Sequence, residues 1–257
     1  MKNLKGQVTI FIIIGILLVS MVVLFFMLKD DVNLPDIGGS RTKVNPPAFL
    51  DSCLENKIKE ATIIIGKQGG YINPKFQRLV TFPGEGPSNI AYLCYQRNFD
   101  KPCIPQEPLL IDNIEKEIAN YISNEVEICF TQLGVSLGDQ GYVVNSNYRS
   151  FNVDLTPKRI TTNINAEIIL TKSGETSRQE DFTFSVPSNI YDLARIAQRI
   201  IIEESSMCEF NTLDFMLNNP DYSIERFTTS DSSTIYSIGN RNTNELFRFV
   251  VRGCVLE

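Results

Sequence analysis

The feature that most constrains this chain is an unbroken apolar run near its N-terminus. From Val8 to Leu28 the sequence has no charged residue over about 21 positions. A helix rises about 1.5 Å per residue, so a helix of this length spans a hydrocarbon core of about 30 Å. A soluble helix is seldom apolar on every face over such a length. The run therefore predicts a transmembrane helix over residues 8–28.

The charges on either side of the run predict its orientation. Lys2 and Lys5 precede it, whereas Lys29 on the other side is followed directly by two aspartates. Lysine and arginine concentrate on the cytoplasmic side of membrane spans. We therefore expect a short cytoplasmic leader over residues 1–7, a single-pass span in the cell membrane, and an extracellular C-terminal domain.

A cleaved secretory signal is the competing interpretation of the same run. The apolar core of such a signal is typically about 7–15 residues long and ends at small residues. The run here is longer, and Phe25-Phe26-Met27-Leu28 offers no such cleavage site. We therefore expect the anchor to be retained.

The beginning of the run resembles a known kind of N-terminus. Lys5-Gly6-Gln7-Val8-Thr9-Ile10-Phe11 consists of a basic leader, a glycine, and a glutamine that opens a long apolar helix. This pattern resembles the class III signal peptide of archaeal type IV pilin-like proteins. The resemblance implies that a prepilin-type peptidase cuts between Gly6 and Gln7. Phe11 departs from the pattern, because many pilins have Glu at that position, although archaellin-like subunits do not.

A second resemblance involves the rest of the chain. Cys53-Leu54-Glu55, which opens an expected helix, and the run Gly-Lys-Gln-Gly-Gly-Tyr-Ile at residues 66–72 make the chain similar to uncharacterised membrane-anchored proteins of small archaea. That group has no established activity, so this resemblance implies none.

Two outcomes are open for the N-terminal helix. Cleavage would remove both leader lysines and allow the helix to leave the lipid and associate with like helices. Retention of Lys2 and Lys5 would hold the helix in the bilayer, because moving those charges through lipid is costly. A pilin-like subunit and a plain uncleaved anchor therefore remain as alternatives.

The remaining sequence predicts a tether followed by one folded domain. Residues 29–47 contain Pro35, Gly38-Gly39 and Pro46-Pro47 with few apolar side chains, which is typical of an extended or flexible spacer. The chain is 43% hydrophobic and 21% charged, so residues 48–257 can bury a core. Its net charge of −6 argues against a nucleic-acid partner, which needs a basic surface.

Hydrophobic periodicity predicts an α+β domain. Helical spacing predicts helices over residues 48–66, 109–133 and 189–204, with Gly66 and Gly134 as the first two helix stops. Alternation predicts strands over 151–155, 164–170, 182–186, 234–238 and 245–256, with hairpin turns at 172–175 and 239–242. We expect the helices to pack on one face of an antiparallel sheet. Residues 69–108 show no clear period, so we expect irregular structure and a contact surface there.

The cysteines indicate disulfides. All six lie outside the apolar run, and an even number in an exported domain points to three bonds among 15 arithmetically allowed pairings. The order of the expected elements favours Cys53–Cys129, Cys94–Cys103 and Cys208–Cys254. Zinc is the alternative, but the chain has neither a CxxC spacing nor a histidine.

No motif for catalysis, for a cofactor or for a metal stands out. The absence of histidine removes the commonest general base. Gly66-Lys67-Gln68-Gly69-Gly70 lacks the spacing of a phosphate-binding loop, and Gly84-Glu85-Gly86 lacks the context of a dinucleotide site. The acids of the 109–133 helix scatter around it, which is typical of a solvated face.

These observations predict a cell-surface structural or binding protein that is not an enzyme and uses no cofactor. Its expected partners are membrane lipid, other copies of the chain through the N-terminal helix, and a surface protein or glycan bound by the Tyr and Phe side chains of residues 69–108. The alternative is an anchored extracellular hydrolase that uses two carboxylates about 5–10 Å apart in one pocket. The sequence offers no candidate pair.

Overall fold

The chain divides into two units, Met1–Lys43 and Val44–Glu257. The computed structural model describes residues 17–20, 44–98 and 100–253. Residues 17–20 are helical, and the rest of the expected span over 8–28 lies outside the described residues, as do Gly6 and Gln7. Within the part of the chain that is described, no helix has both the length and the apolar character needed to cross a membrane.

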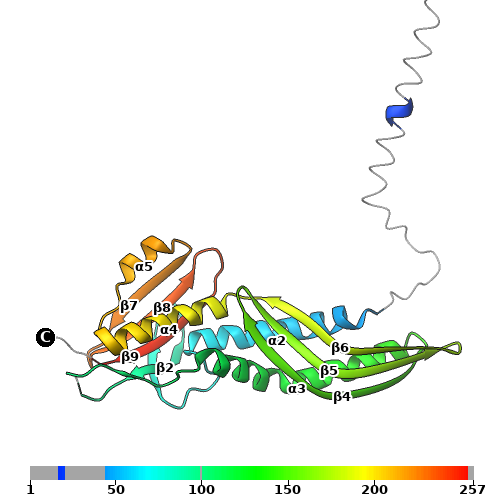
Figure 1. Ribbon diagram of the computed structural model, residues 1–257, viewed down its shortest axis with the longest axis horizontal. Helices are drawn as coiled ribbons and strands as arrows, with labels where there is room; N and C mark the ends of the chain where they lie inside the picture. Colours follow the sequence, from blue (N-terminus) through cyan, green and yellow to red (C-terminus); the bar gives the residue numbers. More distant parts are fainter. Residues whose placement is uncertain (1–16, 21–43, 99, 254–257) are drawn as a thin grey trace, which may run out of the picture. The chain divides into compact units, whose positions relative to one another are not determined.

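The second unit is an α+β domain, as the sequence predicts (Figure 1). Its helices are α2 (Pro46–Lys67), α3 (Leu110–Gly138), α4 (Ile190–Met207) and α5 (Thr212–Asn218). Its strands are β1 (Gln77–Thr81), β2 (Pro87–Tyr95), β3 (Ile104–Pro105), β4 (Val143–Thr156), β5 (Arg159–Lys172), β6 (Glu175–Pro187), β7 (Tyr222–Thr228), β8 (Ser233–Asn240) and β9 (Leu246–Arg252).

Helices α2 and α3 form an antiparallel pair. Cys53 of α2 meets Cys129 of α3, and Glu60 meets Tyr121, so rising numbers on one helix face falling numbers on the other. Each helix buries residues that recur every three or four positions and so share one side. The fully buried ones are Leu50, Leu54, Ile58, Ala61 and Ile65 on α2, and Leu110, Ile114, Ile118, Ile122, Val126, Cys129 and Leu133 on α3.

Strands β4, β5 and β6 form an antiparallel meander over the helix pair (Figure 1). Strand β4 packs on α3, and β6 packs on α2. Alternate side chains, including Ile164, Ile168 and Phe182, point into the core, while their neighbours face outward. The expected turn joins β5 to β6: Ser173 and Gly174 both have positive φ, which a two-residue hairpin of this kind requires.

The second sheet is mixed, which corrects the expectation of a single antiparallel sheet. Its strand order is β1-β2-β9-β8-β7, with β3 paired to β2. Strands β2 and β9 run parallel, whereas the other neighbours are antiparallel. Tyr236, Phe247 and Phe249 lie on the face that belongs to the main core, towards α2 and α4.

The opposite face of this sheet has a small core of its own. Ile90, Ile235 and Val250 are buried there. Phe82, just after β1, packs edge-on against Phe227 of β7, with ring centroids 6.1 Å apart. Arg78 of β1 pairs with Asp231 in the turn between β7 and β8. Side chains therefore connect β1, at one end of the strand order, to β7 and the β7–β8 turn at the other end.

The sequence suggested irregular structure over residues 69–108. The structure instead has strands β1, β2 and β3 in this region. Residues 90–94 of β2 are all buried. A strand that is buried on both faces shows a continuous apolar run without alternation, so periodicity gives no clear signal. Strand β7 and helix α5 were likewise not expected.

The ends of the helices differ from the prediction for local reasons. Helix α2 starts at Pro46, inside the expected tether, because proline suits the first turn of a helix. Helix α3 continues through Gly134, and Leu137 on its next turn is buried. Gly66 does not stop α2, which ends at Lys67. Gly69 and Gly70, both with positive φ, turn the chain instead.

Gly66 is needed because α2 passes very close to the first residue of β9. A Cβ added at Gly66 would lie 2.3 Å from the carbonyl oxygen of Leu246, a backbone atom that cannot move alone. We expect Gly66→Ala to lower the free energy of unfolding by about 1–3 kcal/mol, the usual cost of overpacking. Chemical denaturation of the full chain measures this change.

Gly134→Ala is the matched control, because Gly134 also lies inside a helix. Its added Cβ would have its nearest neighbour 4.0 Å away. Replacing a helical glycine with alanine should then raise stability by about 0.5–1 kcal/mol. Equal effects of the two substitutions would contradict the close approach at Gly66.

Candidate functional site

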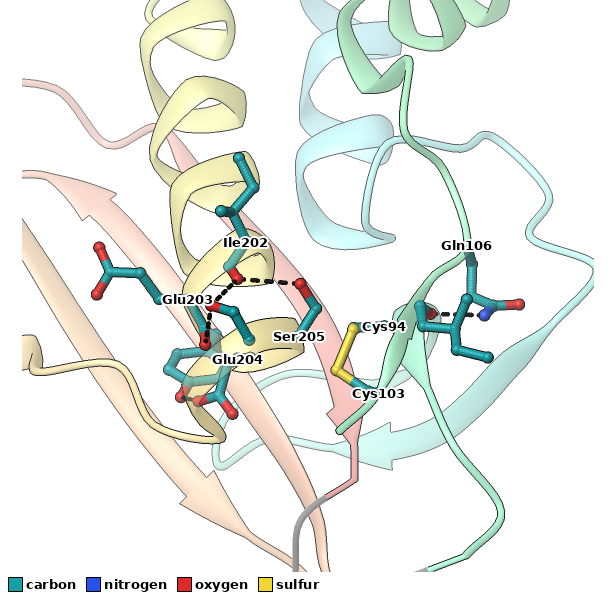
Figure 2. Close-up of a disulfide and its surroundings, with 10 residues drawn as sticks. Cys94, Cys103, Gln106, Ile202, Glu203, Glu204 and Ser205 are labelled. Atoms are coloured by element: carbon teal, nitrogen blue, oxygen red, sulfur yellow. Dashed lines mark hydrogen bonds between the residues drawn. A yellow bond between two sulfur atoms is a disulfide. The ribbon is translucent and has the colours of Figure 1, made fainter. Parts of the chain in front are cut away.

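Two of the expected cysteine pairs are disulfides in the structure. Cys53–Cys129 joins α2 to α3, with Cα atoms 6.0 Å apart. Cys94–Cys103 links β2 to the segment before β3, with Cα atoms 5.3 Å apart. Figure 2 shows the second bond facing the last turns of α4. Cys208 is also disulfide-bonded, and Cys254 lies outside the described residues.

One group of side chains has the composition of a metal site. Ligand atoms of Cys53, Glu125 and Cys129 lie within 4.8 Å of one another. The two sulfur atoms are bonded to each other, so neither is the thiolate that a metal would bind. This group is therefore a disulfide with an acid beside it.

A pocket of about 370 Å³ lies where α2, the β6–α4 connection and the β8–β9 turn meet. We call it the junction pocket. Its lining comprises Lys59, Thr62, Ile63 and Lys67 of α2, Val186, Pro187, Ser188 and Ile190 around the β6–α4 connection, and Thr243, Asn244, Glu245 and Leu246 at the start of β9. Its volume falls in the range of about 300–1,000 Å³ that is typical of small-molecule sites.

The acid in the junction pocket is fully engaged by the protein. The Ser188 hydroxyl donates to Oε1 of Glu245 at 2.6 Å. The backbone N–H and the side-chain amide of Asn189 donate to Oε2 at 2.8 and 2.7 Å. These bonds place a carboxylate at the N-terminus of α4, where the helix dipole favours negative charge. Glu245 therefore fixes the shape of the pocket and has little capacity left for a ligand.

The two hydroxyl groups of the wall, those of Thr62 and Ser188, are buried and add little polar surface to the pocket. The Thr62 hydroxyl donates to the carbonyl oxygen of Ile58 at 2.8 Å, and Thr62 is buried. Ser188 is only 6% exposed. The rest of the wall is mainly aliphatic, and Ile63 is 59% exposed at its edge. The interior is thus suited to an apolar ligand group.

An ion cluster lies beside the pocket. Arg248 donates to both carboxylate oxygens of Glu85, at 2.7 and 3.0 Å, and Lys67 donates to one of them at 3.0 Å. The Arg248 guanidinium also lies 3.9 Å above the centre of the Phe82 ring. Hydrogen bonds from Arg248 and then Lys67 lower the pKa of Glu85 to about 2. One carboxylate is therefore shared by two cations.

A second pocket, of about 610 Å³, lies between α4 and the segment that precedes α3. Two acids line it. Glu107 accepts a hydrogen bond from the Tyr71 hydroxyl at 2.8 Å, and Glu203 pairs with Arg199 at 3.0 Å. Burial, followed by the bond to Glu107, raises the pKa of Tyr71 and keeps its phenol a donor. Each acid therefore already has a donor.

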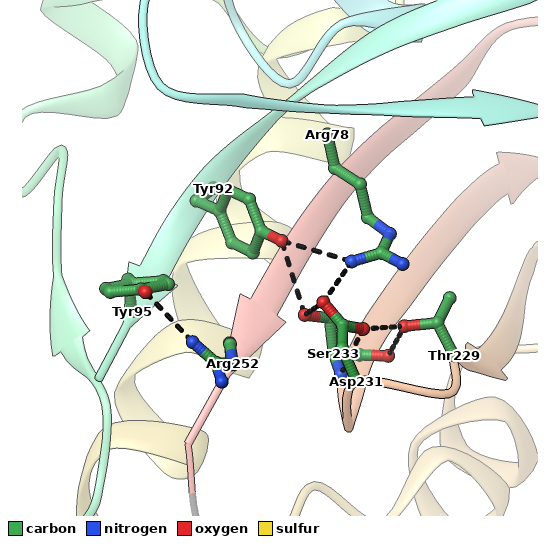
Figure 3. Close-up of polar contacts among 7 residues, drawn as sticks. All are labelled: Arg78, Tyr92, Tyr95, Thr229, Asp231, Ser233 and Arg252. Atoms are coloured by element: carbon green, nitrogen blue, oxygen red, sulfur yellow. Dashed lines mark hydrogen bonds and ion pairs between the residues drawn. The ribbon is translucent and has the colours of Figure 1, made fainter. Parts of the chain in front are cut away.

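The aromatic side chains expected to form a contact surface pack mostly on one another. The ring centroids of Phe76, Tyr92 and Tyr95 are 4.8 to 5.3 Å apart. Tyr92 is only 9% exposed, whereas Phe76 is 44% exposed. Arg252 donates to the Tyr95 hydroxyl at 2.9 Å (Figure 3). These side chains serve the small core beneath β1, and Phe99 lies outside the described residues.

Polar contacts tie β1 to the turn between β7 and β8. Figure 3 shows Asp231 reached by Arg78, Thr229 and Ser233. Burial alone would raise the pKa of Asp231, but hydrogen bonds from Thr229, Arg78 and the Ser233 backbone outweigh it and hold the pKa below its usual value. The ion pair between Arg78 and Asp231, with its supporting hydrogen bonds, therefore holds β1 to the β7–β8 turn.

Comparison of the chain with protein-family models, with curated proteins and with solved structures gives no match. The sequence did not indicate the junction pocket, because its lining comes from three segments far apart in the chain.

The Glu85 cluster predicts a pH dependence of stability. The folded-state pKa of Glu85 is lowered from 4.5 to about 2. The contribution of Glu85 to the free energy of unfolding is therefore complete above about pH 4.5 and is lost as the pH falls towards 2. We expect Glu85→Gln to flatten the decline in unfolding free energy over this window, as measured by urea denaturation from pH 6 to 2.5. Glu175→Gln, at the exposed first residue of β6, is the control and should retain the wild-type slope. A wild-type slope in Glu85→Gln would contradict the role of the pair.

Proposed function

We propose that this chain is a single-pass cell-surface protein whose outer domain, Val44–Glu257, binds a ligand. The observation that carries the proposal is the pair of disulfides, Cys53–Cys129 and Cys94–Cys103, in a domain that follows a long apolar run. Disulfides form and persist in oxidising compartments and are rare in the cytosol. Together with the charges around residues 8–28, they support an extracellular position for the domain.

The junction pocket supports binding in preference to catalysis. Its acid, Glu245, has both oxygens occupied by donors from Ser188 and Asn189. The Ser188 hydroxyl is buried and accepts a bond from the Ile190 N–H, so it holds the connection between β6 and α4. A fixed and mainly apolar wall with cations at its edge is typical of a binding site.

A plain uncleaved anchor is one form of this proposal, and assembly into a filament is the other. Its support is the Lys5-Gly6-Gln7 pattern, because cleavage after Gly6 would free the helix to associate with other copies.

A carboxylate-dependent hydrolase is the competing proposal. The second pocket supports it to the extent that Glu107 and Glu203 line one cavity. Glycoside hydrolysis needs one of two carboxyl groups to act as a general acid. Pairing of Glu203 with Arg199 opposes that use, so we favour binding.

Intact-mass analysis of native protein from the membrane fraction tests the proposal. We expect the mass to rise by two hydrogens for each disulfide on reduction, and we expect the cysteines to react with iodoacetamide only after reduction. An N-terminus at Gln7 would support the pilin-like form, whereas an intact Met1 would remove it and leave a plain anchor. Full-length protein in the cytosol with reactive thiols would overturn the proposal.

A further inference from the structure

The lysine at the edge of the junction pocket can accept a second anion. Arg248 alone satisfies Glu85, because it donates to both carboxylate oxygens, at 2.7 and 3.0 Å. Lys67 adds a third bond to an acid that already has a full partner. Its side chain is 39% exposed. Lys67 can therefore turn to a ligand anion without leaving the Glu85 carboxylate unpaired.

The wall beyond Lys67 selects for alkyl groups. Ile63, Pro187 and Leu246 contribute aliphatic surface from three elements. The polar groups among them are occupied, since Thr62 donates to Ile58 and Glu245 accepts from Ser188 and Asn189. An aliphatic chain loses nothing by burial and gains contact area.

The charges of the lining favour an anion over a cation. Two lysines, Lys59 and Lys67, line the pocket together with one acid, Glu245. Lys59 is paired with Glu55 on the surface of α2, whereas Lys67 shares its acid with Arg248. A single lysine supplies one positive charge, which matches a singly charged carboxylate better than a phosphate monoester of about −1.5 to −2 charge.

We infer that the junction pocket binds a medium-chain aliphatic carboxylate, with its carboxylate at Lys67 and its chain against Ile63, Pro187 and Leu246. The volume of about 370 Å³ sits near the lower end of the range for small-molecule sites, which favours a short chain over a full membrane lipid. This inference deepens the proposed binding function by naming the ligand class of the same pocket.

Photolabelling of the full chain in phosphatidylcholine nanodiscs tests the inference. The probe is a ten-carbon carboxylic acid with a diazirine on its chain, and the labelled residues are mapped by mass spectrometry. We expect label on peptides that contain Ile63 or Pro187, and we expect excess decanoate to remove it. The methyl ester of the probe should label the pocket at least fivefold less.

Two variants and two matched controls locate the site. Lys67→Gln should lower labelling by the acid about five- to tenfold and should leave labelling by the ester unchanged. Ile63→Glu should abolish labelling by both. Lys75→Gln changes another exposed lysine, and Ile202→Glu changes an isoleucine of similar exposure, 64% against 59%, on α4. Both controls should label as the wild type does.

Two results would overturn the inference. One is label that decanoate does not compete for or that Ile63→Glu leaves unchanged. The other is equal labelling by acid and ester in the wild type, which would leave an apolar pocket without selection for a carboxylate. Far-ultraviolet circular dichroism of each variant reports folding separately. The mass and thiol measurements on native protein are independent of the probe, so failure here is distinguishable from failure of the proposed cell-surface function.

Discussion

The packing of α2 against α3 is the interaction on which the rest of the domain depends. A three-stranded meander and a curled mixed sheet each have an apolar face that must be covered. The fully buried residues of the two helices, from Leu50 to Ile65 and from Leu110 to Leu133, belong to the same core as Ile164 of the meander and Phe249 of the mixed sheet. The Cys53–Cys129 bond ties the pair together across 76 positions of sequence and contributes on the order of 2–4 kcal/mol.

The junction pocket is a consequence of this arrangement. At Gly66 the backbone of α2 comes so close to Leu246 that no side chain fits between them. One turn earlier, Ile63 lines the junction pocket, which is the space that remains between α2 and the β8–β9 turn. Glu245 holds the β8–β9 turn to the start of α4 through Ser188 and Asn189, so three elements are fixed around that space. A cavity formed in this way has a defined shape before any ligand arrives, which is why we propose it as the binding site.

The sequence predicted those elements whose signal is local. Helical spacing identified α2, α3 and α4, and alternation identified β4 to β6 and the hairpin of β8 and β9. It failed at β2, where burial on both faces removes the alternation, and at the pairing of β2 with β9, because a parallel contact between distant segments leaves no local pattern. The sequence also predicted Gly66 as a helix stop. The glycine is instead required by the close approach of Leu246, which is 180 positions away and leaves no local pattern. The Cys53–Cys129 and Cys94–Cys103 pairs could be expected from the order of the elements, whereas the junction pocket could not.

The dependence of both sheets on the helix pair is tested most directly by native-state hydrogen exchange of the full chain, with and without reduction of the disulfides. If the account is correct, the buried turns of α2 around Ile58 and the centre of β9 around Phe249 exchange with the same free energy of opening, and reduction lowers both values together. If β9 keeps its protection while α2 around Ile58 exchanges freely, the mixed sheet is stable alone and the helix pair is not what holds the domain together.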